Sequence, residues 1–299
     1  MLQRFADKLL RDEPMSKYTA ARLGGAADYV YIARETGDAL IEILTSAWNE
    51  GIPARVIGGG ANVLVADRGV RGLVIIDRQS EVTFEGNIVT VSGGHSLTVL
   101  SHKLQARGLT GFEWAVSVPG TIGGAVVNNA GAHKSDMAAA VREARIVDAE
   151  RGTYTLTREE LAFGYRTSSL KQRVDRRFLV LSAVMEFSAD DPKAIQARMN
   201  ENIAYRKRTQ PPGASLGSIF KNPPGDYAGR LIESCGLKGY QIGGAQVSPV
   251  HANFFINTGH TTANDYAALI RYVQVTVHAK TGVLLEPEVE LVGDWADVP

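Results

Sequence analysis

The chain has 299 residues, 44% hydrophobic and 21% charged, which is long enough for two or three compact units, each with its own core. Lysine plus arginine and aspartate plus glutamate number 32 each, so no broad basic field exists to bind a nucleic-acid backbone or an anionic membrane. The single cysteine, Cys235, excludes an internal disulfide, argues against a cysteine-based metal site and fits a reducing cytosol.

The N-terminal residues alternate apolar and charged positions. Leu2, Phe5, Leu9 and Leu10 recur at helical spacing, which predicts an amphipathic helix docked on a core rather than a secretion signal. No apolar run reaches the length of about 18 residues that a membrane span needs, so we expect no transmembrane segment. The sequence therefore predicts a soluble, cytoplasmic protein.

Periodicity and turn residues predict the elements of the first two thirds of the chain. We expect helices at 37–50, which Gly51 ends, and at about 96–107, with a glycine-rich segment at 117–132. The predicted strands are short and cover 55–57, 63–65, 73–76, 88–92, 144–148, 153–157 and 178–187.

A polar helix over 191–209 is followed by Gln210-Pro211-Pro212-Gly213, where the proline pair and the glycine predict a domain boundary. After this boundary we expect helices at 226–235 and 262–280 and strands near 240–247, 253–257 and 284–292. The layout is mixed α+β without regular βαβ alternation.

The first of two glycine-rich loops is Gly58-Gly59-Gly60-Ala61-Asn62-Val63. Consecutive glycines let the backbone approach a ligand closely and turn successive N–H groups towards an anion. A β-branched run follows, whereas the dinucleotide fingerprint of the doubly wound fold needs a helix there. A tight hairpin turn remains an alternative.

The second loop runs from Pro119 to Ala125 and is followed by Asn128-Asn129-Ala130-Gly131-Ala132. Its small residues leave main chain bare for a planar ring or a pyrophosphate. Asn128 and Asn129 could offer amide groups to ring edges. Close packing of the loop against a strand is the competing interpretation.

Five segments together resemble one enzyme family. They are Gly58–Val65, Pro119–Ala125, Tyr165-Arg166-Thr167-Ser168, Gly217–Pro223 and Leu285–Val289, and they occur in family order between about Tyr18 and Gly293. The family is that of the UDP-N-acetylenolpyruvoylglucosamine reductases, flavoenzymes of peptidoglycan precursor synthesis. The short link between Gln246 and Phe254 resembles the shorter members, which lack an inserted tyrosine loop. Asn128 and His133-Lys134 depart from the usual family pattern.

The resemblance implies a two-subdomain FAD-binding unit of the PCMH or vanillyl-alcohol-oxidase type and a C-terminal α+β substrate-binding domain. We place the subdomains at 1–78 and 79–195 and the substrate domain at 196–299. The implied cofactor is non-covalently bound FAD, with NADPH as co-substrate. The expected FAD-binding residues are Gly58, Gly59, Gly60, Asn62, Val63, Pro119, Gly120, Thr121, Gly123, Gly124, Ala125 and Asn129.

The implied reaction has two halves: NADPH reduces FAD, and the enolpyruvyl group of UDP-N-acetylglucosamine enolpyruvate is then reduced to give UDP-N-acetylmuramate. Hydride addition places negative charge next to the substrate carboxylate, so the site needs an electrophile and a proton donor. By family match, Ser218 is the proton donor, Arg166 binds the carboxylate and Glu288 is the catalytic glutamate. A salt bridge remains the alternative for Arg166.

Several further assignments stay open. Strand periodicity would place Glu286, Glu288 and Glu290 on one face, so the sequence does not rank them and Glu286 is the fallback. Tyr165, Lys221 and Asn222 are expected to bind substrate, and Tyr205, Arg208 and Gln210 are weaker candidates for the same entrance. The six histidines show no ligand spacing, so we expect no metal. An FAD oxidase of the same cofactor fold and a non-catalytic flavin-binding module are the competing functions.

Overall fold

The computed structural model describes residues 2–34 and 38–295. The chain divides into two compact units, which we call the first unit (Met1–Leu10, Val30–Gly59 and Gly72–Arg206) and the second unit (Arg11–Tyr29, Gly60–Arg71 and Lys207–Pro299). Each unit is assembled from segments that are distant in the sequence. The predicted division at 1–78, 79–195 and 196–299 stays a prediction.

The N-terminal prediction of one amphipathic helix is wrong. The 3₁₀ helix η1 (Leu2–Lys8) is followed directly by strand β1 (Leu9–Pro14). Leu9 and Leu10 therefore belong to a sheet, in which β1 lies next to β2 (Ala26–Ala33). Pairing with β2 satisfies the backbone of this segment, and this tertiary contact overrides the local helical spacing.

A four-stranded sheet with the order β1-β2-β5-β3 contains β3 (Ala54–Ile57) and β5 (Val70–Asp77), which pair in parallel. Residues 73–77 are all buried, as expected for a parallel strand that is covered on both faces. Helix α1 (Asp38–Asn49) confirms the helix predicted at 37–50, whose first residue lies outside the described residues.

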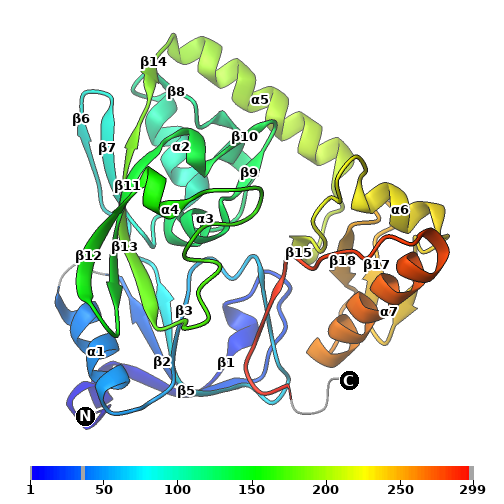
Figure 1. Ribbon diagram of the computed structural model, residues 1–299, viewed down its shortest axis with the longest axis horizontal. Coiled ribbons are helices and arrows are strands. Elements are labelled where there is room, and N and C mark those ends of the chain that lie inside the picture. The colour runs from blue at the N-terminus through cyan, green and yellow to red at the C-terminus, as the bar shows by residue number, and fades with distance from the viewer. Residues whose placement is uncertain (1, 35–37, 296–299) are drawn as a thin grey trace. The chain divides into compact units, whose positions relative to one another are not determined.

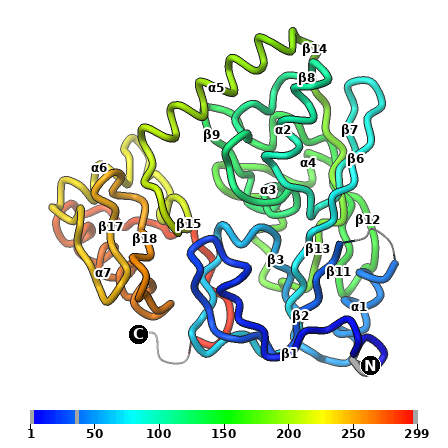
Figure 2. The backbone as a smooth tube through the Cα atoms, turned by 180° about the vertical axis from the view of Figure 1, so that it is seen from behind, coloured from blue at the N-terminus to red at the C-terminus, as the bar shows by residue number. Residues whose placement is uncertain are grey.

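The larger sheet of the first unit has five antiparallel strands in the order β12-β11-β13-β7-β6. Their bounds are β6 Val82–Glu85, β7 Ile88–Ser92, β11 Val141–Asp148, β12 Gly152–Thr157 and β13 Phe178–Glu186. Helix α3 (Ile122–Asn128) packs on β7 and β13, and α2 (Leu97–Gln105) adds buried leucines to the same core (Figure 2).

Short elements and one long helix complete the first unit. The short ones are β8 Leu109–Thr110, η3 Glu113–Ser117, β9 Gly131–Ala132, β10 Ser135–Asp136, η4 Met137–Ala139, α4 Arg158–Leu161 and β14 Ser188–Ala189. The long helix α5 (Pro192–Thr209) confirms the polar helix predicted at 191–209 (Figure 1).

The second unit has a four-stranded antiparallel sheet with the order β15-β18-β17-β16. Its strands are β15 Ala214–Ser218, β16 Gln241–Ile242, β17 Ala245–Val247 and β18 Phe254–Asn257. Helices α6 (Ala228–Ser234) and α7 (Ala263–Thr281) pack with this sheet (Figure 1). The short helix η2 (Met15–Lys17) also belongs to this unit.

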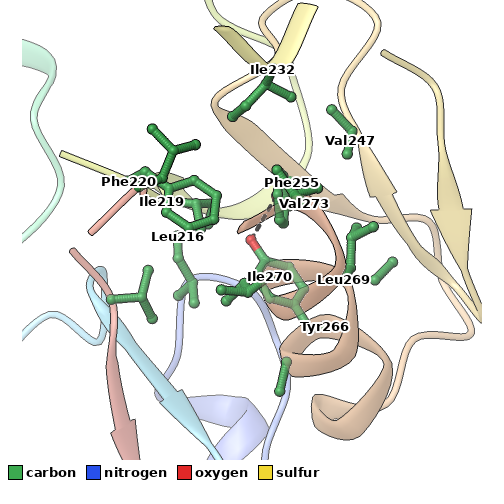
Figure 3. Close-up of a cluster of buried hydrophobic side chains, with 14 of the residues drawn as sticks. Leu216, Ile219, Phe220, Ile232, Val247, Phe255, Tyr266, Leu269, Ile270 and Val273 are labelled. Atoms are coloured by element: carbon green, nitrogen blue, oxygen red, sulfur yellow. Dashed lines mark hydrogen bonds between the residues drawn. The ribbon is translucent and has the colours of Figure 1, made fainter. Parts of the chain in front are cut away.

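The core of the second unit lies between its sheet and α7. Ile219 and Phe220 enter this core from the segment after β15, and Tyr266 enters it from α7 (Figure 3). The Tyr266 hydroxyl donates a hydrogen bond of 2.8 Å to the carbonyl of Phe255, so this buried phenol keeps a polar partner. The two residues that follow Ser218 are therefore anchored by burial.

The prediction of a strand over 284–292 is wrong for most of its length. Strand β19 covers only Glu290–Val292, where it pairs in parallel with β4 (Val63–Val65). The preceding residues are irregular apart from a single bridge between Phe220 and Pro287.

No helix within the described ranges is long and apolar enough to cross a membrane.

Candidate functional site

The two glycine loops touch each other within the first unit. A methyl group on Gly58 would lie 2.1 Å from Thr121 Oγ1, and one on Gly59 would lie 2.7 Å from the Cα of Gly120. Both distances are far below any real Cβ contact, so these two positions require glycine. The loops therefore approach each other main chain to main chain, although about 60 residues separate them in the sequence.

The second loop is not fully irregular, because it contains the short helix α3. Thr121 caps this helix by accepting a hydrogen bond from the N–H of Gly124, and Asn129 ends it in a left-handed conformation with φ 42°. Within α3, the side chain of Ala125 is buried and Gly124 is exposed. Pro119, before the helix, is exposed as well. The N–H of Gly123 donates to the carbonyl of Gly93 and is thereby committed to the fold.

Four other backbone donors in these loops have no protein acceptor. Across the described ranges, the N–H groups of Gly58, Gly59, Gly120 and Thr121 make no hydrogen bond with another protein group. Such donors need a polar partner. A bare surface with open N–H groups fits the ring edge or pyrophosphate of a flavin nucleotide.

Gly60, Asn62 and Val63 belong to the second unit, and their environments are structural. A methyl group on Gly60 would lie 1.9 Å from the carbonyl oxygen of Tyr18, so packing alone requires glycine there. Val63 begins β4. The side-chain amide of Asn62 donates to the carbonyl of Glu288 at 2.9 Å. Flavin contacts by these three residues stay predictions.

His95 and Lys103 support the second loop, and the sequence did not reveal this role. The backbone carbonyl of His95 accepts a hydrogen bond from the N–H of Ile122, the first residue of α3. This bond fixes where α3 begins. Its Nδ1 lies 2.9 Å from the carbonyl of Ser96 and must carry the proton, which leaves Nε2 to accept from Lys103 Nζ at 3.1 Å. Burial lowers the pKa of His95, which keeps the ring neutral.

Asn129 holds the second loop together. Its side-chain nitrogen donates to Asp136 and to the carbonyl of Gly164, and its oxygen accepts from the N–H of Ala138. The side chain is buried. These bonds use both donors of the amide, which favours a structural role over the predicted contact with a ring edge.

Arg166 reaches from the loop after α4 onto the strand that follows Asn129. Its Nη2 donates to the carbonyl of Gly131 at 2.6 Å, and its guanidinium lies 5.3 Å from the ring centre of the exposed Tyr165. The backbone of Arg166 has a left-handed φ of 56°, a conformation that is costly for a long side chain and is found most often at functional sites. The guanidinium has a planar fork that can pair with a carboxylate.

Ser218 ends β15, opposite Phe254 on β18. Gly217 before it has φ 75° and open space around its Cβ position, so the conformation, not crowding, calls for glycine there. In the part of the chain that the structure describes, the Ser218 hydroxyl makes no hydrogen bond to a protein group. This hydroxyl is available to a ligand.

Glu288 is placed beside the serine segment by main-chain bonds. Its N–H donates to the carbonyl of Ile219 at 2.7 Å, and the N–H of Lys221 donates to the carbonyl of Glu286 at 2.9 Å. Together with the bridge between Phe220 and Pro287, these bonds show that the segments 219–221 and 286–288 lie antiparallel to each other. The sequence-predicted serine and glutamate are therefore brought together although 70 residues separate them.

The neighbouring pair Lys221 and Glu286 form an ion pair with an Nζ–Oε1 distance of 2.6 Å. This contact commits Glu286 to a lysine, and it competes with the predicted binding of substrate by Lys221. The side-chain oxygen of Asn222 accepts from the N–H of Ala228 at the start of α6, which gives this residue a structural task as well.

Asn253 is the main residue of this region that sequence reasoning missed. It is buried, its Oδ1 accepts from the N–H of Phe220, and its Nδ2 donates to the carbonyl of Phe220 at 2.8 Å. Its own carbonyl accepts from Ile219. An isolated asparagine in a β-rich stretch carries no sequence signal for such a brace.

Ser218 and Glu288 thus lie in the second unit, whereas Arg166 and the paired glycine loops lie in the first. Over residues 2–34 and 38–295, no three His, Cys, Asp or Glu residues gather in a way that could hold a metal ion.

Comparisons with known proteins give the family. Residues 209–292 match the model of the UDP-N-acetylenolpyruvoylglucosamine reductase C-terminal domain, and residues 29–157 match that of an FAD binding domain. These matches confirm the predicted fold, and the cofactor is FAD, which fits the open donors of the glycine loops.

Whole-chain relatives agree with the two domain matches. The chain is 42% identical over 292 residues to the UDP-N-acetylenolpyruvoylglucosamine reductase of Bacillus velezensis, covering 96% of this chain and 94% of the relative. It is 41% identical to reductase 2 of Symbiobacterium thermophilum, covering 96% and 92%. The crystal structure of the Thermus caldophilus reductase, MurB, superposes with a TM-score of 0.78 at 34% identity and covers 93% and 97% of the two chains. The chain therefore belongs to the UDP-N-acetylenolpyruvoylglucosamine reductase family.

Proposed function

We propose that this protein uses NADPH and FAD to reduce the enolpyruvyl group of UDP-N-acetylglucosamine enolpyruvate, forming UDP-N-acetylmuramate for peptidoglycan synthesis. The observation that carries the proposal is the antiparallel pairing of the Ile219–Lys221 and Glu286–Glu288 segments, which brings the backbone of Glu288 next to the segment that follows Ser218. The protein acts on a small-molecule UDP-sugar, and we place it in the cytoplasm, in keeping with its single buried cysteine.

When bound and reduced by NADPH, the flavin would supply a hydride to the enolpyruvyl carbon. The electron pair of the carbon–carbon double bond then moves towards the adjacent carbon and its carboxylate. Arg166 pairs with this carboxylate and stabilises the charge as it develops, because the planar guanidinium can donate two parallel hydrogen bonds.

Ser218 gives its hydroxyl proton to the adjacent carbon and is reprotonated afterwards from solvent. A free hydroxyl is a weak acid, so the transfer depends on a placement within about 3 Å of the reacting carbon. The φ of Gly217 and the burial of Ile219 and Phe220 fix the backbone on both sides of this serine.

Glu288 binds the substrate on the same side as Ser218 and donates a hydrogen bond when protonated. Its main chain is tied through its N–H to Ile219 and through its carbonyl to Asn62. Tyr165, Lys221 and Asn222 contact the sugar diphosphate, with Lys221 exchanging its bond to Glu286 for one to the ligand. The glycine loops hold FAD without a covalent bond.

The test is an absorbance spectrum of the purified protein, taken under anaerobic conditions before and after NADPH and then the UDP-sugar. We expect a yellow protein that bleaches with NADPH and recolours only with the UDP-sugar. Ser218→Ala should bind FAD and bleach at the wild-type rate but recolour at least about 100-fold more slowly. Normal recolouring would remove Ser218 from its role.

Two other results would contradict the proposal at different points. A colourless protein that cannot be reconstituted with FAD would remove the cofactor role from both glycine loops. A yellow protein that recolours with oxygen and an alcohol, but not with the UDP-sugar, would make the chain an oxidase of the same cofactor fold.

A further inference from the structure

The turn that leads into β18 is closed by a histidine side chain. His251 Nδ1 accepts a hydrogen bond of 3.2 Å from the backbone N–H of Asn253, two residues later. The backbone carbonyl of the same histidine accepts from the N–H of Phe254 at 2.9 Å. Both bonds have His251 as their acceptor, so this one residue holds the turn over 251–254 in shape.

The His251 ring is fixed by its surroundings. It is half-buried and packs edge-on against Phe254, with 4.9 Å between ring centres and an interplanar angle of 65°. It also meets helix α6, because a methyl group on Gly229 would lie 3.2 Å from its Cε1. The hydroxyl of Ser248 accepts from the N–H of His251 at 3.3 Å and holds the backbone. The ring therefore has little freedom to turn Nδ1 away from Asn253.

The bond to Asn253 requires a neutral ring. A backbone N–H can only donate, so Nδ1 is the acceptor and the single ring proton of the neutral form lies on Nε2. A second proton would bind to Nδ1 itself, and the ring would then present a donor to the N–H of Asn253. Asn253 is buried, and a buried N–H that loses its acceptor is costly.

The groups around the ring keep it neutral at neutral pH. Burial is the main cause that lowers the pKa of His251, and a backbone hydrogen bond opposes it. The charge of Lys238, in the turn after α6, adds to the lowering, and that of Glu233, on α6, opposes it. These two side chains form an ion pair of 2.8 Å with each other. The ring is therefore expected to take up its second proton only in moderately acidic solution.

Two connections lead from this turn to Ser218. The side chain of Asn253 bonds both the N–H and the carbonyl of Phe220, and its own carbonyl accepts from the N–H of Ile219. Phe254, which ends the turn, is the strand partner of Ser218. If the turn opens, the serine segment is loosened through both connections.

From these bonds we propose that the neutral His251 ring positions Ser218 through Asn253, and that protonation of the ring slows reduction of the UDP-sugar. The inference rests on the proposed function, in which Ser218 gives a proton to the substrate. His251 is a positioning residue, because it acts through Asn253 and not on the substrate. Reduction of the flavin should not depend on this ring, since the paired glycine loops belong to the first unit.

The experiment uses the likeness between histidine and asparagine at this position. The Oδ1 of an asparagine can accept from the N–H two residues later, but an amide does not titrate. His251→Asn therefore keeps the acceptor and removes its pH dependence, whereas His251→Ala removes the acceptor. His260→Asn removes an exposed histidine of the same unit and serves as the control.

The bound flavin of each protein is reduced with a stoichiometric amount of dithionite, and recolouring by saturating UDP-sugar is followed from about pH 5.5 to about pH 8. We expect wild type and His260→Asn to recolour roughly 10-fold more slowly at the acidic end. His251→Asn should lose this fall and stay within about three-fold of the wild-type rate at the alkaline end. His251→Ala should be slower by roughly 10-fold throughout.

Three results would overturn the proposal. The first is the same acidic fall in wild type and in His251→Asn, since pH effects from other groups are common to both proteins. The second is a wild-type rate that stays flat across the whole range. The third is recolouring of His251→Ala at the wild-type rate at the alkaline end.

Amide hydrogen exchange of the segment 219–222 gives a readout that needs no substrate. In the FAD-loaded protein, His251→Ala should exchange these amides roughly 10-fold faster than wild type, and His251→Asn should match wild type. Equal exchange in all the proteins would contradict a positioning role. If wild type fails to recolour at any pH, the proposed function fails, and the exchange rates still decide whether His251 holds this segment.

Discussion

Glu286 and Glu288 are two residues apart, yet the structure gives them different surroundings. The side chain of Glu286 is 69% exposed and paired with Lys221. Glu288 is half-buried and tied by main-chain bonds to Ile219 and Asn62. The two glutamates therefore differ in burial and in bonding, a difference that sequence periodicity could not give, and Glu288 as the reacting carboxyl stays our proposal.

Glu288→Gln should lower turnover by roughly 100-fold or more, because an amide N–H donates a much weaker hydrogen bond to the developing negative charge than a carboxylic acid O–H does. Glu286→Gln should change turnover by less than about three-fold, since an exposed ion pair contributes little. Steady-state rates of NADPH oxidation with saturating UDP-sugar measure both variants. The reverse order of losses would move the assignment to Glu286.

Arg166→Lys should impair the reaction despite the kept charge. One ammonium group cannot reproduce the two parallel hydrogen bonds of the guanidinium, and it cannot hold the carbonyl of Gly131 and a carboxylate together. We expect kcat/KM for the UDP-sugar to fall by roughly 10- to 100-fold, while flavin bleaching by NADPH changes little. Unchanged kinetics for the UDP-sugar would show that Arg166 has a structural role and does not bind the substrate carboxylate.

At the scale of elements, the segment after β15 is held in position by Asn253, a residue that lies outside this strand. Asn253 satisfies both the N–H and the carbonyl of Phe220, which are buried. The aromatic ring of Phe220 then packs in the core with Phe255, at 6.2 Å between ring centres. Because Ile219 and Phe220 are buried in this way, the backbone at Ser218 is held in position as well.

Asn253→Ala should lower the free energy of unfolding by roughly 2–3 kcal/mol, because it leaves two buried backbone groups without partners. It should also slow recolouring by the UDP-sugar, since Ser218 is no longer held. Urea titration and anaerobic stopped flow measure the two effects.

Thr262→Ala is the matched control in the same unit. It removes the cap of α7, at a cost of about 1 kcal/mol, without touching the Ser218 segment. If both variants recolour at the wild-type rate, Asn253 stabilises the unit but does not position the serine.

At the scale of the whole molecule, a buried carboxyl makes stability depend on pH. Asp77, at the end of β5, is buried, and desolvation raises its pKa to about 6. The unfolded chain has the usual value of about 3.9, so the folded protein binds the proton more tightly. The stabilisation from this group is complete below about pH 4 and is lost as the pH rises through about 6.

Asp77→Asn should therefore gain stability relative to wild type as the pH rises from about 4.5 to 7.5, by up to about 2–3 kcal/mol. The amide oxygen can still accept the hydrogen bond from the N–H of Gln79. Urea unfolding of both proteins at the two pH values measures the change. Identical pH dependence in both proteins would show that the carboxyl is solvated in the fold.

Much of the fold followed from local chemistry. Helix α7 begins at the capping box of Thr262 and Asp265 and ends at Gly282, which are signals in adjacent residues. Strand β12 alternates, β13 is largely apolar, and α5 precedes a proline pair, whereas β6 was not predicted. Such elements are predicted because their causes lie within a few residues of them.

The errors have causes that are distant in the sequence. Leu9 and Leu10 form a strand because β2 is available to pair with them. The run before β19 pairs with the distant segment Ile219–Lys221 through a single bridge, between Phe220 and Pro287, and does not form a longer strand. The side chains of Asn62 and Asn129 hold backbone carbonyls, bonds that no local pattern shows, and their flavin contacts stay predictions.

By itself, the sequence determined the family, the cofactor class and the segments that carry the chemistry, because glycines, a serine and charged residues at fixed spacings are local features. Only the tertiary structure decided that Glu286 pairs with Lys221 while Glu288 is half-buried, and that Asn62, Asn129 and Asn253 hold backbone carbonyls. Those distinctions depend on hydrogen bonds and burial between residues 30 to 230 positions apart in the chain, and no local pattern encodes them.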